Sequence, residues 1–262
     1  MQKERFCYLI RVQYLGFRYS GWQKQPNQKT IEQMILKTLR FVLPDNKTKV
    51  LAAGRTDAKV SALEAAFELF IDGPLADNRL FLEEFNKNLP PDIRALHINE
   101  VSQEFNIIQH SKRKEYVYLF SFGIKNHPFC APFLANIIES LDIQIMKEGA
   151  RVFEGEHDFS AYTSRMQENS KFLRKIERCV IQNNTLLSAN FFPETSYALH
   201  ITATGFMRYQ VRMIMGALIE LGKGKLTVQE IEASLKGSHV TPMTYVAPGS
   251  GLLLNKLEFK EN

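Results

Sequence analysis

The segment GRTDAKVSA, residues 54–62, places an arginine, a threonine and an aspartate side by side after a glycine. It joins two apolar runs, TKVLAA and AAFELFI, that read as buried strands. With an ordinary pKa of about 4, Asp57 is a carboxylate at neutral pH, so it is able to act as a nucleophile or a base. Asp and Gly are also common turn residues, and on composition alone a simple turn is the more ordinary interpretation.

An aromatic strand is the second candidate for chemistry. In EYVYLFSF, residues 115–122, period-two alternation puts four aromatic side chains on one face: Tyr116, Tyr118, Phe120 and Phe122. The basic run HSKRK precedes them, and cations beside an aromatic face suit unstacked RNA bases. The alternative is that the aromatics belong to the core, which we favour for the last three. For Tyr116, next to the charged residues, both interpretations stay open.

Two arginines near the start of a predicted helix over residues 207–222 are the third candidate. The helix has an apolar stripe of core residues: Val211, Ile214, Met215 and Leu218. Arg208 and Arg212 lie four residues apart on a neighbouring face, where a cation opposes the helix dipole. A partner carboxylate or phosphate would explain them, and solvated arginines are the alternative.

Other kinds of site have no support in the sequence. It contains no metal-ligand spacing, P-loop, GxGxxG or defensible Ser/His/Asp arrangement. The three cysteines are widely spaced, which predicts buried thiols in a reducing compartment. There is no signal-peptide pattern and no run of about 18 apolar residues, so we expect a cytoplasmic protein without a membrane span. The net charge of +5 permits a polyanionic partner without requiring one.

Periodicity and capping signals place these residues on a mixture of strands and helices. Strands are predicted at 5–14, 48–54, 65–71, 93–101, 115–122, 197–205 and 251–259, and helices at 30–43, 80–89, 141–155, 207–222 and 227–237. Thr30 and Gln33 predict a capping box. Because no regular βαβ repeat is present, the expected class is α+β with a largely antiparallel sheet. Two loosely similar halves are expected, 1–102 and 103–262, which hints at duplication.

Seven motifs in order resemble the tRNA pseudouridine synthase A (TruA) family. YLGFRYSGWQKQP is similar to its opening Tyr-x-Gly motif, and GRTDAKVSA to its central GRTDAGVHA. The others are NLPPDI, KEYVY, GEHDFSAY, GFMRYQVRMIMGALIELGKG and APGSGLLL. Each motif is weak alone, but together they cover nearly the whole chain.

The resemblance implies isomerisation of uridine to pseudouridine at positions 38–40 of the tRNA anticodon stem-loop. It implies two related α+β halves with a joined, largely antiparallel sheet, a central cleft between the halves and a homodimer, with no cofactor and no metal. Asp57 would be the nucleophile, Arg212 its ionic partner and Tyr116 the residue that stacks on the target base. Arg55 would hold the flipped nucleotide. Contacts to RNA would come from basic residues: Arg11, Arg18, Lys24, Lys112, Arg113, Lys114 and Arg208.

The sequence departs from the family pattern at three places. Lys59 stands where the family has Gly, and Ser61 where it has His. The usual Phe-His-Ala-Arg becomes the segment 105–108, Phe-Asn-Ile-Ile, which lacks the arginine. Leu253 replaces a frequent aromatic residue. These departures concern RNA choice more than chemistry, so two alternatives stay open: an RNA-binding paralogue with reduced catalysis, and a synthase with another RNA target.

Overall fold

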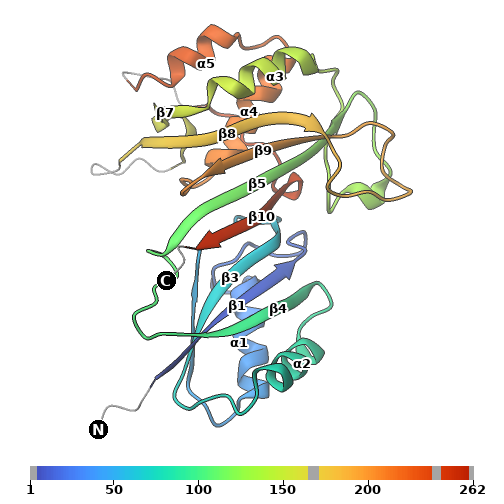
Figure 1. Ribbon diagram of the computed structural model, residues 1–262. Helices are drawn as coiled ribbons and strands as arrows, with labels where there is room; N and C mark the ends of the chain where they lie inside the picture. Colours follow the sequence, from blue (N-terminus) through green and yellow to red (C-terminus); the bar gives the residue numbers. More distant parts are fainter. Residues whose placement is uncertain (1–4, 165–170, 238–242, 260–262) are drawn as a thin grey trace. The chain divides into compact units, whose positions relative to one another are not determined.

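The computed structural model describes residues 5–164, 171–237 and 243–259 (Figure 1). The chain divides into two compact units. Unit 1 comprises Met1–Lys112 together with Leu254–Asn262, and unit 2 comprises Arg113–Leu253. Each unit combines helices with mostly antiparallel strands, so the predicted α+β class is confirmed. Residues 165–170, part of the charged segment SRMQENSKFLRKIERCV that is expected to lead into a strand, lie outside the described residues.

The strands of unit 1 are paired with one another in one sheet. They are β1 (Phe6–Tyr14), β2 (Thr48–Ala52), β3 (Ser61–Ile71), β4 (Ile93–Val101) and β10 (Leu252–Phe259). β1 lies antiparallel between β4 and β3, with Ile10 opposite both Ile98 and Phe67. β2 also pairs with β3, and β10 is the other neighbour of β3. The segment 48–71 therefore forms two paired strands whose connection is the loop with Asp57.

Two capped helices belong to unit 1. α1 (Ile31–Val42) begins after Thr30, whose side chain accepts a hydrogen bond from the backbone N–H of Gln33, as half of the predicted capping box requires. α2 (Asn78–Asn88) begins after Asp77, whose carboxylate accepts from two backbone N–H groups. α2 packs against α1 and β4 (Figure 1). Both helices lie close to their predicted bounds.

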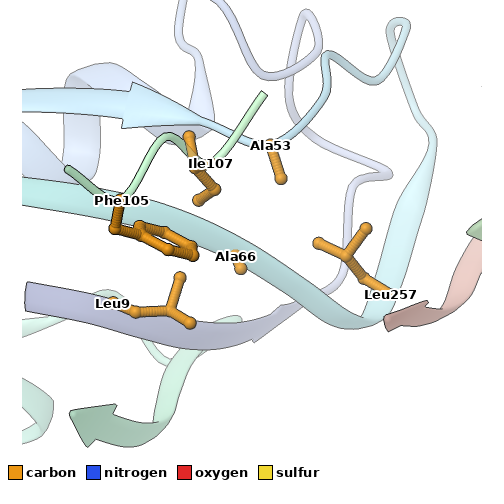
Figure 2. Close-up of a cluster of buried hydrophobic side chains, with 6 residues drawn as sticks. All are labelled: Leu9, Ala53, Ala66, Phe105, Ile107 and Leu257. Carbon is orange, nitrogen blue, oxygen red and sulfur yellow. The ribbon is translucent and has the colours of Figure 1, made fainter. Parts of the chain in front are cut away.

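A hydrophobic cluster of unit 1 joins parts that are far apart in sequence. Figure 2 shows its six buried side chains, which come from β1, the Asp57 loop, β3, the segment after β4, and β10: Leu9, Ala53, Ala66, Phe105, Ile107 and Leu257. Ile107 is fully buried and Ile108, where the family has arginine, is 58% exposed. Of the two isoleucines in the segment that departs from the family pattern, Ile107 therefore belongs to the hydrophobic core.

Unit 2 contains β5 (Ser111–Phe122), β6 (Ala135–Ile137), β7 (Gly155–Asp158), β8 (Leu173–Asn183) and β9 (Tyr197–Ala203). Its strand order is β5-β9-β8-β7, antiparallel, while the short β6 pairs parallel with β5. α3 (Ile143–Val152) packs against α4 (Gln210–Gly222), α5 (Val228–Ser234) and β8 (Figure 1). Three short 3-10 turns complete the elements: Pro128–Cys130, Ser160–Tyr162 and Gly249–Gly251.

Three helices predicted in unit 2 have other bounds in the structure, and one of them, expected over 227–237, ends at Ser234. The helix expected over 141–155 ends at Val152, and Gly155 instead opens β7 with a φ of 104°. The helix expected to begin at Met207 begins at Gln210, because Tyr209 adopts the left-handed conformation. Arg208 therefore precedes α4 and does not share a helix face with Arg212, which corrects that prediction.

The aromatic strand is mostly core. Tyr118 and Phe120 are fully buried, and so are Val117 and Leu119, which alternate with them along the strand, so β5 is covered on both faces. The core interpretation is thus confirmed for Tyr118 and Phe120. Phe122 is only partly buried and its ring stacks on Tyr197 at 5.6 Å between centroids.

Two further expectations concern the cysteines and membrane-spanning helices. Cys7, Cys130 and Cys179 are buried free thiols, as predicted. Within 5–164, 171–237 and 243–259, no helix is both long enough and apolar enough to span a bilayer.

Candidate active site

The loop that carries Asp57 is held by its backbone on both sides of the carboxylate. Before Asp57, the carbonyl oxygen of Thr56 accepts a hydrogen bond from the N–H of Trp22 at 3.1 Å. After it, the N–H of Lys59 donates to the carbonyl oxygen of Tyr19 at 3.0 Å. Both partners belong to the loop that follows β1. The two motifs that were separate in the sequence, residues 14–26 and 54–62, therefore form one structural piece.

Two glycines allow this close approach. A Cβ at Gly21, whose φ is 95°, would lie 2.6 Å from the carbonyl oxygen of Thr56. A Cβ at Gly16 would lie 1.9 Å from the carbonyl oxygen of Val60, closer than any side chain tolerates. The N–H of Gly16 donates to Ser61 Oγ at 2.9 Å. Ser61, a departure from the family pattern, thus has a structural contact within the same loop pair.

Lys59 adopts a conformation that suits glycine. Its φ is 67°, in the left-handed region, which costs a residue with a Cβ about 1–2 kcal/mol. The family's glycine would avoid this cost. The exposed side chain of Lys59 places its Nζ 5.7 Å from the centroid of the Phe17 ring.

Side chains around Asp57 differ in exposure. Asp57 and Thr56 are partly exposed and Arg55 is exposed. The hydroxyl groups of Thr56 and Tyr14 are hydrogen-bonded at 2.9 Å. The loop thus carries a carboxylate and a guanidinium two residues apart, on a backbone that is held by the hydrogen bonds to Trp22 and Tyr19.

Arg18, predicted to contact phosphate, pairs with Asp92 of the NLPPDI motif. Its guanidinium forms an ion pair with the carboxylate, and Nη2 lies 2.8 Å from Oδ1. Tyr19 donates its hydroxyl to the same oxygen at 2.7 Å. Burial alone would raise the pKa of Asp92, but the hydrogen bonds from Arg18 and Tyr19 outweigh it and the pKa is lowered. Burial and the bond to Asp92 raise the pKa of Tyr19 to about 12.

The other two candidate catalytic residues belong to unit 2. Arg212, in the first turn of α4, donates from Nε to the carbonyl oxygen of Ala247 at 2.7 Å. Its guanidinium carbon lies 5.2 Å from the centre of the Tyr209 ring. The Tyr116 ring, in β5, packs edge-to-face on Phe206 at 5.4 Å, and the residue is 9% exposed.

Six of the seven basic residues predicted to contact RNA fall into two groups, and the seventh, Lys114, is partly buried, which lowers its pKa. Lys24, Lys112 and Arg208 are exposed. Arg11, Arg18 and Arg113 each pair with a carboxylate of the protein, respectively Glu64, Asp92 and Glu177. The three paired arginines have a structural role in addition to any contact with RNA.

Sequence reasoning missed two residues of this arrangement. Asp92 lies in the NLPPDI motif, but the sequence assigned no contact to it. Its place directly after Pro90 and Pro91 was the only sign that it matters. Tyr209 carried no signal, because a tyrosine before a helix looks like an ordinary aromatic. Within the part of the chain that the structure describes, no group of three or more His, Cys, Asp or Glu side chains could hold a metal ion.

The chain is similar in sequence to several known proteins. A family model described as tRNA pseudouridine synthase matches residues 150–260. The tRNA pseudouridine synthase A of Thermodesulfovibrio yellowstonii is 30% identical over 261 residues, covering 95% of this chain and 97% of that protein. The tRNA pseudouridine synthase A 2 of Bacillus anthracis is 28% identical, covering 96% and 99%. The crystal structure of the archaeal box H/ACA sRNP Nop10–Cbf5 complex matches at 14% identity, covering 94% of this chain and 46% of that chain, but its TM-score of 0.32 carries no weight.

These relatives show that the chain is an enzyme of the isomerase class. Within that class, the chain belongs to the tRNA pseudouridine synthase A family.

Proposed function

We propose that the protein isomerises uridine to pseudouridine at positions 38–40 of the tRNA anticodon stem-loop, with Asp57 as the nucleophile. The observation that carries this proposal is the clamp on the Asp57 loop, in which Trp22 and Tyr19 bind the backbone one residue before and two residues after the carboxylate. A turn that only connected two strands would not need Gly16 and Gly21 packed against its backbone. A fixed backbone is what a positioned nucleophile requires.

The reaction breaks the N1–C1′ bond of uridine and forms a C5–C1′ bond in its place. In one route the Asp57 carboxylate attacks C1′ as N1 leaves, and C5 displaces the carboxylate when it bonds to C1′. In the other route the carboxylate removes a sugar proton to give a glycal-like intermediate and returns that proton when the C5–C1′ bond forms; both routes stay open. After the detached base turns, C5 bonds to C1′, the hydrogen on C5 leaves as a proton, and N1 ends with a proton. The substrate and product are isomers, so the reaction needs neither oxidant nor reductant.

Three side chains would support Asp57 in this reaction. Arg212 pairs with the carboxylate, which keeps it ionised and aimed. Tyr116 stacks on the target base and assists loss of the C5 proton. Arg55, exposed two residues before Asp57, holds the nucleotide after it leaves its stem. Arg212→Ala is expected to lower turnover without abolishing RNA binding, measured as kcat and Kd on the same transcript.

The exposed cations would hold the RNA backbone. Lys24, Lys112 and Arg208 are suited to phosphate contacts, which depend on salt and not on sequence. We extend the proposal to a homodimer in the cytoplasm that uses no cofactor. Sedimentation of the pure protein tests whether it is a dimer. Turnover in a buffer without metal or cofactor tests whether the reaction needs a cofactor.

The decisive experiment compares wild type with Asp57→Asn on unmodified tRNA transcripts. We expect wild type to form pseudouridine in the anticodon stem-loop, and Asp57→Asn to lose turnover by about 10³-fold or more with RNA affinity within a few-fold. Asp45→Asn, an exposed carboxylate elsewhere in unit 1, is the matched control and should keep full activity. Substantial turnover by Asp57→Asn would refute the nucleophile.

A second candidate function has specific support. Lys59, and Ile108 in place of an arginine, favour a paralogue with another RNA target or with reduced catalysis. Incubation with total cellular RNA separates these cases: product at other uridines indicates a different target, and binding without any product indicates a binding protein.

A further inference from the structure

Tyr209 has an unusual backbone for an aromatic residue. Its φ is 64° and its ψ is −1°, the left-handed conformation, directly before α4. Bulky side chains are rare there, whereas asparagine and glycine adopt it readily. The side chain makes no capping hydrogen bond to the helix; only the carbonyl oxygen does so, accepting from Met213 N–H at 2.9 Å. Capping therefore does not explain why a tyrosine occupies this position.

The ring explains it better, because two guanidinium groups lie over it. The guanidinium carbon of Arg208 is 4.9 Å from the ring centre and that of Arg212 is 5.2 Å away. Arg208 Nη2 also donates to the Tyr209 hydroxyl at 3.3 Å. Aromatic rings attract cations, so one ring holds two like charges near each other.

Arg212 also forms hydrogen bonds with Ala247, in the segment that follows residue 242. Its Nε donates to the Ala247 carbonyl oxygen at 2.7 Å, and the Ala247 N–H donates to the Arg212 carbonyl oxygen at 3.1 Å. The Ala247 contact fixes the Nε edge of the guanidinium and the Tyr209 ring fixes its other side. Neither contact uses the two terminal nitrogens, which are the atoms suited to a bidentate bond with a carboxylate.

We propose that Tyr209 is a positioning residue for Arg212. The left-handed backbone brings its ring under the guanidinium, and the ring and Ala247 together fix the direction of the two terminal nitrogens. This inference rests on the proposed function, in which Arg212 keeps Asp57 ionised.

Three substitutions separate positioning from simple packing. Tyr209→Phe keeps the ring and should retain kcat within about threefold. Tyr209→Leu removes it and should lower kcat about tenfold with KM changed less than twofold, as expected when about 1.4 kcal/mol is lost. Tyr209→Asn also removes the ring but suits the left-handed backbone, so it should be at least as stable as wild type and yet as slow as Tyr209→Leu.

The pH profile supplies a readout that packing alone would not move. Without a well-aimed Arg212 the pKa of Asp57 rises, so the acidic limb of kcat/KM should move to higher pH in the Asn and Leu variants and stay in place in Tyr209→Phe. Wild-type kcat and an unmoved acidic limb in Tyr209→Asn would overturn the inference.

Asp57→Asn, run in the same assay, tells the two proposals apart. If Asp57→Asn is inactive while Tyr209→Asn behaves as wild type, only the positioning role fails. If wild type forms no product on tRNA, or Asp57→Asn stays active, the proposed function fails and the role of Tyr209 fails with it.

Discussion

Lys59 is the residue at which this chain accepts backbone strain next to its candidate nucleophile. A left-handed lysine costs about 1–2 kcal/mol, whereas glycine at the same place loses about 0.5–1 kcal/mol in chain entropy. Two hydrogen bonds hold the loop in this shape in spite of the cost. The Lys59 N–H donates to the Tyr19 carbonyl oxygen, and the Gly16 N–H donates to Ser61 Oγ.

Lys59→Gly should therefore raise the free energy of unfolding by up to about 1 kcal/mol, because relief of strain exceeds the entropy loss. Urea unfolding followed by circular dichroism measures the change. Lys37→Gly, at an exposed lysine in the middle of α1, is the control and should lower stability by about 1 kcal/mol. Equal losses in both variants would show that the Lys59 backbone is not strained.

At the same scale, sequence reasoning succeeded where a side chain follows its ordinary preference. Tyr118 and Phe120 were expected in the core and are there. It failed at Arg208, because the helix was extended back through Tyr209, and no periodicity reveals a left-handed residue. The pairing of Arg18 with Asp92 joins positions 74 residues apart, which no local pattern contains.

The Arg18–Asp92 pair acts between elements, tying the loop after β1 to the residue just before β4. The pKa of Asp92 in the folded protein is lowered, so its stabilising effect is present above the unfolded pKa of about 4 and is lost as pH falls through the lower folded value. Asp92→Asn should thus be less stable than wild type at pH 7, and the difference should shrink below about pH 4. Urea midpoints between pH 2.5 and 7 measure this; a difference independent of pH would contradict it.

Elements with strong local signals were predicted well, and short ones were not. Thr30 and the apolar spacing placed α1, and the alternation in IRALHINEV placed β4 at its observed bounds. β7 was missed because four residues, Gly155–Asp158, carry no period and owe their strand form to pairing with β8. Gly155 looked like a helix end, yet its positive φ opens that strand.

For the whole molecule, the main surprise is the return of the chain to unit 1 at Leu254. The pattern of GLLLNKLEF predicts a strand but does not reveal its neighbour, so its place beside β3 had to come from the structure. The predicted division into residues 1–102 and 103–262 stays a prediction about domains.

Leu257→Ala tests the integrity of unit 1 from the far end of the chain. Leu257 is 1% exposed in the cluster of Figure 2, so the substitution should cost about 2–5 kcal/mol. Hydrogen exchange should show lost protection in β1 and β3. Leu235→Ala, equally buried but in unit 2, is the control, and faster exchange in β1 and β3 in both variants would contradict separate effects on the two units.

The late arrival of β10 also sets an order of events on the ribosome. Residues 5–112 are made first, but Leu257 is translated only after all of unit 2, which takes roughly ten seconds or more at ~5–20 residues per second. Until then β3 is paired with β1 and β2 but lacks β10, and the cluster around Leu9 and Ala66 lacks the Leu257 side chain. The nascent unit that carries Asp57 therefore lacks its last strand while unit 2 is made, and during that time it is exposed to chaperones and proteases.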